Sequence, residues 1–600
     1  MKAPLAQAAW VAVALVVVAV ARIVSTYHDF NQAYDEPAHI ACGMEWLDKG
    51  TFNMEPQHPP LPRVMSALGP YLAGLRLPEV GFAGGNKANG YDFYTAGNQI
   101  LFARGQYLHI LTLARLGTLP FLVIAAWITF LWTRSLVGEW PAVLAVLLLT
   151  TMPVVLGYST LAYVDPALMA MFPAALFACV RWLERPSWQR SLALGAALAG
   201  MALANAPWMV FFPPCAAVIL ACRWWVGRAA LGRASGEKPR AATGGLPALR
   251  RWVNPAILAL AMAGVVLWAG YRFSVERLNT VFENPRYAIE HVHLPSPVKA
   301  IILKVIDFNP PLPAPAFFQG IGRAIGENGK LYPAYLFGQV RRGGWWYFYF
   351  FMLAFKTPPG ALLLGLAGLA WALRRFWVER DWQMAAPAVA LVAILLVAMT
   401  IRVNLGVRTI LFLYPLLAVL GGVAGQCVWF LRAKWPKLAP AALLAILAWL
   451  VLDGVDLHPN YLTYTSALAG RPPDYSLVLD ADFDAGQNVL RLAEELRKHG
   501  VDHLKLRLYT SADLLQMGLP PFETLAPYEH ATGWVAISVH NLRTGEGPWI
   551  PAQRDGYEWL TAYPSVPTSV DKTIRLYHLP EPGSSATGRR VFLPAKRAGA

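Results

Sequence analysis

Charged residues are scarce in this chain. Only 14% of its 600 residues are Asp, Glu, Lys or Arg, whereas 56% are hydrophobic and the mean hydropathy is +0.40. Several soluble domains of this total length would need a larger share of polar residues to cover their surfaces. The composition therefore excludes an ordinary soluble protein and places the chain in a lipid bilayer.

Cysteine is also scarce, with five residues in all. Only Cys42 falls in a segment expected outside the membrane, so we expect no disulfide framework. The sequence also has no Walker-type phosphate loop, dinucleotide fingerprint, Ser-centred nucleophile elbow or Cys-x-x-Cys pair. A reaction driven by ATP or by a nucleotide sugar is thus unsupported. The other four cysteines lie in apolar stretches, where packing explains them: Cys179, Cys215, Cys222 and Cys427.

Long apolar segments dominate what is present. About eleven of them are long enough to cross roughly 30 Å of hydrocarbon. The first follows Lys2 and also resembles a signal peptide, although its cleavage would still leave the next segment outside. The predicted spans lie near residues 7–25, 107–132, 139–156, 161–182, 191–205, 207–226, 253–273, 346–373, 384–401, 406–431 and 438–453.

The net charge of +15 comes mainly from short connections between the spans. Arg and Lys cluster near residues 181–190, 223–251, 374–380 and 432–437, which is the pattern of cytoplasmic loops under the positive-inside rule. With the N-terminus inside, all four clusters are cytoplasmic. The segments 26–106, 274–345 and 454–600 then lie outside.

Two domains are expected. Residues 1–455 form the helical membrane domain, with the long external loops 26–106 and 274–345. Residues 456–600 have a soluble composition and form a small extracytoplasmic α/β domain. Its predicted elements are strands at 477–479, 504–509, 534–539 and 573–577 around a helix at 485–499.

The first external loop gathers acidic and imidazole side chains. Asp35 and Glu36 precede Pro37 and His39, and His58 follows in a Pro-rich stretch. One interpretation is that Asp35 only caps a helix that begins at this proline. The other is that Asp35 is a general base placed where a hydroxyl acceptor and a membrane-bound donor meet.

Several short motifs occur in an order typical of one superfamily. Taken together, they resemble the GT-C glycosyltransferases that use lipid carriers and, within these, the bacterial relatives of the protein O-mannosyltransferases (glycosyltransferase family 39-like). Two departures are Asn205-Ala206, where a Thr-Lys-like pair is common, and Ala485, where the family often has Trp. The matching residues are Asp35-Glu36, His58-Pro59-Pro60, Tyr332 to Gly338, Gly343 to Phe348, Lys356-Thr357-Pro358 and Val403 to Arg408.

The resemblance implies a multi-pass protein of the cell membrane, the inner membrane of a bacterium, with its active site outside. It assigns catalytic roles to Asp35, Glu36 and Asp165; capping is the alternative for Asp165. Cationic side chains near the external surface are expected to bind the phosphate of the donor. The donor-binding candidates are His39, His58, Arg63, Arg341, Arg342, Lys356, Arg402 and Arg408.

The implied reaction is a single displacement with inversion. Asp35 deprotonates an acceptor hydroxyl, which attacks the anomeric carbon of a hexosyl or pentosyl group while polyprenyl phosphate departs. The acceptor is a glycan, a lipid or a protein, and no nucleic acid is involved. A lipid or glycan transporter (flippase) and a catalytically silent assembly subunit are the alternatives. Asp35, Asp165 and His58 are also candidates to share a divalent cation, the one cofactor considered.

The topology is testable with single cysteines placed in a background without the five native ones. In intact cells, an impermeant thiol reagent should label positions 53, 309 and 504 but not positions 235 and 433, because only the first three are expected outside. Labelling at 235 but not at 53 would contradict the topology.

Overall fold

The computed structural model describes residues 3–79, 92–234, 246–281, 285–286, 290, 295–470, 477, 479, 483–544 and 555–580. The chain divides into two compact units. Unit 1 consists of Met1–Gln487 with Thr510–Asp513, and unit 2 consists of Asn488–Tyr509 with Leu514–Ala600. Position 235, one of the labelling sites above, lies outside the described residues.

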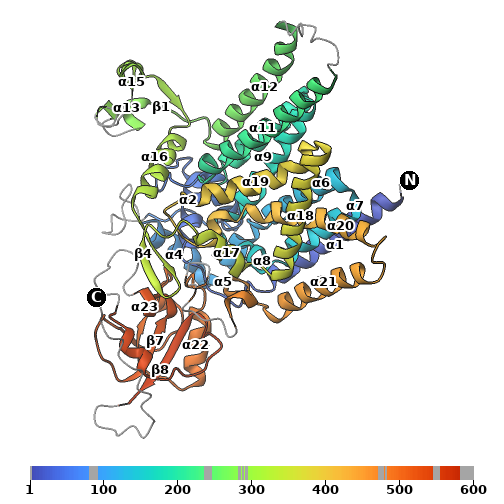
Figure 1. Cartoon of the computed structure of the whole chain (residues 1–600). Helices are drawn as coiled ribbons and strands as arrows, with labels where there is room; N and C mark the ends of the chain where they lie inside the picture. Colours follow the sequence, from blue (N-terminus) through green and yellow to red (C-terminus); the bar gives the residue numbers. More distant parts are fainter. Residues whose placement is uncertain are drawn as a thin grey trace, which may run out of the picture. The chain divides into compact units, whose positions relative to one another are not determined.

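Unit 1 is mostly helical, as the sequence predicts, and carries two short two-stranded sheets (Figure 1). One sheet pairs β1 (Val275–Arg277) with β2 (Pro311–Pro313), and the other is a hairpin of β3 (Pro333–Leu336) and β4 (Gln339–Arg342); both are antiparallel. The helices are α1 (Ala3–Val24), α2 (Glu36–Asp48), α3 (Pro60–Leu72), α4 (Phe93–Phe102), α5 (Tyr107–Leu116), α6 (Leu119–Val137), α7 (Glu139–Thr151), α8 (Pro153–Ser159), α9 (Asp165–Glu184), α10 (Trp188–Ala202), α11 (Trp208–Ala234), α12 (Leu246–Gly270), α13 (Leu278–Val281), α15 (Ser296–Phe308), α16 (Pro315–Gly329), α17 (Phe348–Lys356), α18 (Pro359–Glu379), α19 (Trp382–Ala398), the 3-10 turn η2 (Val407–Ile410), α20 (Leu413–Leu431) and α21 (Leu438–Asp456).

The chain is a multi-pass membrane protein. Within the described residues, eight helical segments are long and apolar enough to span a bilayer, and joining α7 to α8 across a 63° bend gives a ninth. The prediction of about eleven also counted α10, with 15 residues, and α19, with 17. Both are shorter than the roughly 20 residues that a straight span needs.

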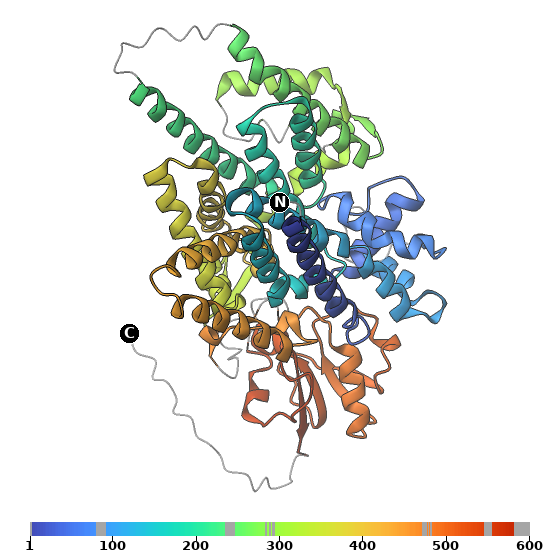
Figure 2. The same ribbon diagram turned by 90° about the vertical axis from the view of Figure 1, so that its right-hand side faces the viewer.

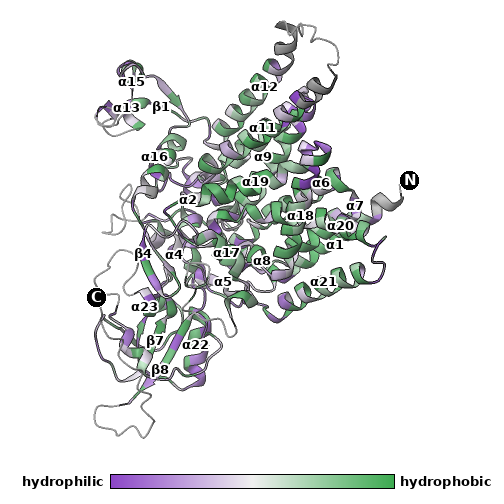
Figure 3. Ribbon diagram, viewed as in Figure 1, coloured by the Kyte–Doolittle hydropathy of each residue, from purple (hydrophilic) through white to green (hydrophobic). Residues whose placement is uncertain are grey.

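Close helix packing builds the centre of unit 1. The helices α1, α6, α7, α9, α18 and α20 lie side by side (Figures 1 and 2), and their contact surfaces contain many small residues. At Gly368, for example, an added Cβ would lie only 1.8 Å from the carbonyl oxygen of Leu420, so a larger side chain would separate α18 from α20. Small residues at such crossings allow the close backbone approach on which helix packing in lipid depends. Figure 3 shows that these helices are predominantly hydrophobic.

The segment that follows α1 forms a helical layer of its own. Helices α2 to α5 share a separate apolar cluster that includes Ile40, Met44, Ile100 and Leu111. Gly97 allows α4 to approach α2, because a Cβ there would lie 2.1 Å from the carbonyl oxygen of Pro37. This packing fixes the start of α2, where Asp35 lies.

Unit 2 is a small α/β fold, as the sequence predicts. Its four-stranded sheet has the order β6-β5-β7-β8, with β7 and β8 antiparallel and the other pairs parallel. Apolar clusters cover both faces of the sheet. The elements are α22 (Val489–Lys498), β5 (Leu504–Arg507), β6 (Phe522–Thr524), β7 (Gly533–Ser538), α23 (Val539–Thr544) and β8 (Ile574–Leu579).

Unit 1 extends past α21 to Gln487, and the predicted domain division at 455/456 stays a prediction. Residues after α21 bond to earlier parts of unit 1: the amide of Ser466 donates to the carbonyl of Phe355 (2.6 Å), and the carbonyl of Ala485 accepts from the amide of Tyr34 (2.7 Å). The strand predicted at 477–479 is not seen at Leu477 or Leu479, and residue 478 lies outside the described residues.

Candidate active site

Asp35 occupies the N-cap position of α2, but its side chain does not cap the helix. One carboxylate oxygen, Oδ2, accepts from Nη1 of Arg408 at 3.2 Å, and the other, Oδ1, accepts from the hydroxyl of Tyr94 at 3.4 Å. The side chain is 28% exposed, so one side of the carboxylate faces solvent. The capping interpretation of Asp35 therefore lacks the hydrogen bond it requires.

Arg408 bridges two carboxylates. Besides Asp35, its Nε lies 3.2 Å from Oδ2 of Asp165, in an ion pair that is not a well-aligned hydrogen bond. The guanidinium carbon also lies 5.0 Å from the centroid of the Tyr163 ring, within range of a cation–π contact. Burial would lower the pKa of Arg408, but Asp165 and Asp35 together raise it above its ordinary value. Arg408 is thus a permanent cation between two acids.

The turn that presents Arg408 depends on two segments of the chain that pack together. Gly406 has φ +87°, a conformation that favours glycine, and the turn η2 begins directly after it. Asn404 accepts a hydrogen bond from the amide of Trp345 (2.9 Å), and the Tyr349 hydroxyl donates to the carbonyl of Val403 (2.7 Å). The stretch 403–408 is therefore held against the aromatic stretch 343–349.

Asp165 begins α9 and is nearly buried. Its other oxygen, Oδ1, accepts from Nδ2 of Asn205 at 3.4 Å. Two residues earlier, the hydroxyl of Tyr163 accepts the backbone N–H of Asp35 at 3.2 Å. Burial and the adjacent Asp35 raise the pKa of Tyr163 well above its ordinary value, so this phenol stays neutral. The loops before α2, α9, α11 and α20 thus meet around one arginine.

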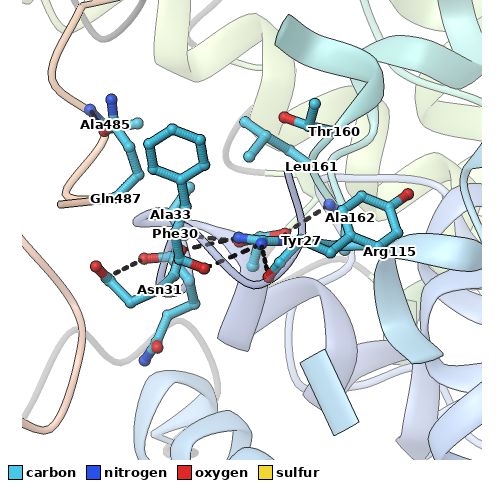
Figure 4. A network of polar contacts seen from close by, with 12 residues as sticks. Tyr27, Phe30, Asn31, Ala33, Arg115, Thr160, Leu161, Ala162, Ala485 and Gln487 are labelled. Carbon is cyan, nitrogen blue, oxygen red and sulfur yellow. Dashed lines mark hydrogen bonds and ion pairs between the residues drawn. The ribbon is translucent and has the colours of Figure 1, made fainter. Parts of the chain in front are cut away.

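Glu36 pairs with a different arginine, Arg115. Its buried carboxylate accepts from Nε (2.9 Å) and Nη2 (2.8 Å) of Arg115 on α5, and from the amides of Ala33 (2.7 Å) and Ala162 (2.8 Å). Figure 4 shows how this arginine reaches the loop that follows α1, where it also donates to the carbonyl of Asn31 (2.8 Å). The pair joins the segment that carries Asp35 to the segment that carries Asp165. The structure does not bring Glu36 to Arg408, and its catalytic role stays a prediction.

A second polar cluster lies beside the first. Arg63 is buried, pairs with Glu55 and donates to Nδ1 of His39 at 3.3 Å, and Nδ1 of His58 lies 2.9 Å from Oε2 of Glu55. The ring of His39 packs edge-on against those of His58 (5.6 Å) and Tyr163 (5.7 Å). His39, His58 and Arg63 are thereby brought together, next to the Asp35 site.

The charges of this second cluster are well defined. Burial would raise the pKa of Glu55, but Arg63 and His58 outweigh it and lower that pKa below its ordinary range. Burial and the cation of Arg63 lower the pKa of His39, so its imidazole is neutral at pH 7. Within the described residues, Nε2 of His39 has no hydrogen-bond partner.

The remaining candidates lie elsewhere. Lys356 is buried at the end of α17, donates to the carbonyl of Leu462 (3.1 Å) and lies 4.8 Å from the Phe483 ring, so it does not extend to a membrane interface. Arg341 and Arg342 are exposed on β4, and Arg402 is exposed before η2. Their roles in donor binding stay predictions.

No group of three or more His, Cys, Asp or Glu side chains that could hold a metal is found in the described part of the chain. The carboxylates of Asp35 and Asp165 are joined by Arg408 instead. A divalent cation at these two acids would have to displace that guanidinium, and it stays a prediction.

Four polar residues of these networks were not identified from the sequence: Tyr94, Arg115, Tyr163 and the carboxylate partner of Arg63, Glu55. Of these four, Arg115 has the clearest signal in the sequence, because a lone arginine within an apolar stretch requires a buried acid. The tyrosines gave no such signal, since aromatic residues are common near membrane interfaces. Asn205 was noted only as a departure from the family pattern, and the structure places it against Asp165.

Comparison with known proteins bears on this arrangement. Residues 111–231, which carry Arg115, Tyr163, Asp165 and Asn205, match the family model described as dolichyl-phosphate-mannose-protein mannosyltransferase. Over this segment the chain is similar to that family, in agreement with the resemblance that the motifs indicated. No curated protein sequence matches the chain.

Two solved structures are similar to this chain over most of its length. ArnT from Cupriavidus metallidurans bound to undecaprenyl phosphate is 14% identical, with 95% of this chain and 98% of that chain covered and a TM-score of 0.42. The Archaeoglobus fulgidus oligosaccharyltransferase in its apo form is also 14% identical, with 87% and 62% covered and a TM-score of 0.40. Similarity at this level says nothing about the donor or the acceptor of this chain.

The Glu36–Arg115 pair makes a stability prediction. Glu36→Gln or Arg115→Met alone should lower the free energy of unfolding by about 3–5 kcal/mol, because each leaves a buried charge without its partner. The double variant should be more stable than either single variant. Thermal unfolding in detergent compares the stability of the three variants with that of the unmodified chain. If the double variant loses the sum of the two single losses of stability, the pairing is contradicted.

Proposed function

We propose that this chain transfers a sugar from a polyprenyl-phosphate carrier to an acceptor hydroxyl, with inversion, on the extracytoplasmic side of the membrane. The observation that carries the proposal is the carboxylate of Asp35. It does not cap its helix, it is partly exposed, and a permanent cation holds it beside a second acid. The family match supports a lipid-phosphate donor, since its description names dolichyl phosphate mannose.

Asp35 is the general base. Its exposed side accepts the proton of the acceptor hydroxyl while the hydroxyl oxygen forms a bond to the anomeric carbon. The bond from that carbon to the phosphate oxygen breaks at the same time, and polyprenyl phosphate leaves with the electron pair. One displacement of this kind inverts the anomeric configuration. No separate general acid is needed, because phosphate is a good leaving group when cations stabilise its charge.

Arg408 binds the donor phosphate. In the arrangement seen, its guanidinium is shared by Asp35 and Asp165, and a phosphate is a bidentate partner that competes with a carboxylate for the same N–H groups. Binding of the donor would therefore draw Arg408 away from Asp35 and leave the base free for the acceptor. Asp165, held by Asn205, remains to orient the guanidinium.

The second cluster extends the donor site. Arg63 and His58 supply a further cation and an imidazole, and Glu55 positions both. His39 lies between His58 and Tyr163 and connects this cluster to the Asp35 site. Glu36 acts through Arg115 as a positioning residue for the Asp35 loop. With the N-terminus inside, these groups lie at the outer surface, where a flipped lipid-linked sugar is available.

The activity can be tested on the purified protein in lipid nanodiscs with labelled polyprenyl-phosphate sugars and candidate acceptors. We expect free polyprenyl phosphate and a glycosylated acceptor in equal amounts, with the opposite anomeric configuration by NMR. Movement of labelled lipid across vesicles without release of polyprenyl phosphate would favour the transporter instead. If neither sugar transfer nor lipid movement is detected, the catalytically silent subunit is favoured. If a chelator abolishes transfer, the reaction requires a divalent cation.

Arg408 gives the donor-binding prediction. Arg408→Ala should weaken binding of polyprenyl phosphate by about 1.5–3 kcal/mol, roughly tenfold or more, because a hydrogen bond to a charged group is worth this much. Arg408→Lys should recover binding only in part, since lysine lacks the planar fork.

Binding is measured by scintillation proximity or by quenching of a labelled lipid, so the result does not depend on turnover. Arg104→Lys, at an exposed turn of the first external loop, is the matched control and should bind normally. Unchanged affinity in Arg408→Ala would remove Arg408 from the donor site.

A further inference from the structure

Helix α15 carries an apolar stripe that nothing in the described part of unit 1 covers. Val298, Ile301, Val305 and Phe308 are 43%, 64%, 45% and 78% exposed. Their spacing of three, four and three residues places them on one face of the helix. The same helix buries Ile306 on another face. Large side chains exposed in a continuous row mark an interaction surface.

The charges beside this stripe are mainly basic. Lys299 and Lys304 lie within α15, and its single acid, Asp307, is paired with Arg286 at 2.6 Å. Lys304 lies next to Phe308 around the helix, whereas Lys299 lies about 140° from the centre of the stripe. An apolar face bordered by a lysine fits a helix that lies in the interface of a membrane with anionic lipids.

The link between α15 and the membrane-spanning helix α12 also indicates that lipid covers the apolar stripe. Helix α12 ends at Gly270, and only 6% of the segment Trp252–Gly270 is buried inside the protein, so its surface is available to lipid except where it packs on α10. Figure 3 shows α12 as hydrophobic over most of its described length, and Figure 1 shows α13, β1 and α15 to the left of α12. The short link contains two more exposed apolar residues, Phe273 (56%) and Val275 (50%). The apolar surface of the span thus continues into the external segment.

We infer that α15 lies at the membrane–water interface on the external side of the membrane that the chain spans. Its Val298–Phe308 face contacts the acyl chains, and its lysines lie among anionic headgroups. The external segment between α12 and α17 is then attached to the bilayer at both ends and at α15. This attachment holds α16 beside the first external loop, where a Cβ added at Gly320 would lie 2.3 Å from the carbonyl oxygen of Pro56. The lipid-linked donor would approach the site along a surface to which this segment is already bound.

Site-directed spin labelling tests this assignment on the whole protein. Cysteines at Ile301 and Phe308, in a background without native cysteines, are labelled in nanodiscs that contain phosphatidylglycerol and one protein copy each. Ala300, an exposed neighbour about 100° around the helix from Ile301, is the matched control. Accessibility to lipid-soluble oxygen and to a water-soluble nickel chelate gives the depth of each label.

Labels at Ile301 and Phe308 should be accessible to oxygen and protected from nickel, at a depth of about 5–10 Å, while the label at Ala300 stays accessible to nickel. Equal nickel accessibility at all three sites would overturn the assignment. Protection that appears only with two copies per nanodisc, together with dipolar coupling between labels, would show that a second copy covers the face instead. Either result is independent of sugar transfer, which is measured separately.

Discussion

The contact between Arg408 and the two acids Asp35 and Asp165 is the interaction on which the site depends. The three residues come from segments far apart in the chain, and each would be costly to place near the membrane alone. Together they have a net charge of −1 and hold the loops before α2, α9 and α20 in one place. Such an arginine can bind an anionic phosphate if the phosphate replaces one of its two carboxylate partners.

Two further buried pairs support this centre. Glu36 with Arg115 ties the Asp35 loop to the Tyr163 loop, and Glu55 with Arg63 holds His58 and His39, of which His39 packs against the same tyrosine. Buried ion pairs contribute little net stability, but they strongly disfavour any arrangement in which one partner is left alone. Their effect here is to specify how the external loops meet, which is what a site assembled from loops requires.

Much of this could be predicted from the sequence. Hydropathy identified the spans because a bilayer demands about twenty apolar residues each, and α10 and α19 fall short only in length. Asp35, Asp165 and Arg408 were candidates because a charge at the end of an apolar run is rarely neutral in function. The choice of partners was not predictable: Glu36 finds Arg115 rather than Arg408, and Lys356 turns inward to Leu462. Such pairings depend on the three-dimensional packing of α2 to α5, which has no periodic signature.

The central claim, that Asp35 is the base, is tested most directly by Asp35→Asn compared with Asp92→Asn. Asp92 is a true N-cap, because its side chain accepts from the amide of Thr95 at 3.0 Å, and Asn is an equally good cap. With the native donor and acceptor, we predict that Asp92→Asn keeps its turnover. Asp35→Asn should still fold and bind the donor but lose on the order of a hundredfold to ten-thousandfold in turnover. Full turnover in a well-folded Asp35→Asn protein would contradict the account.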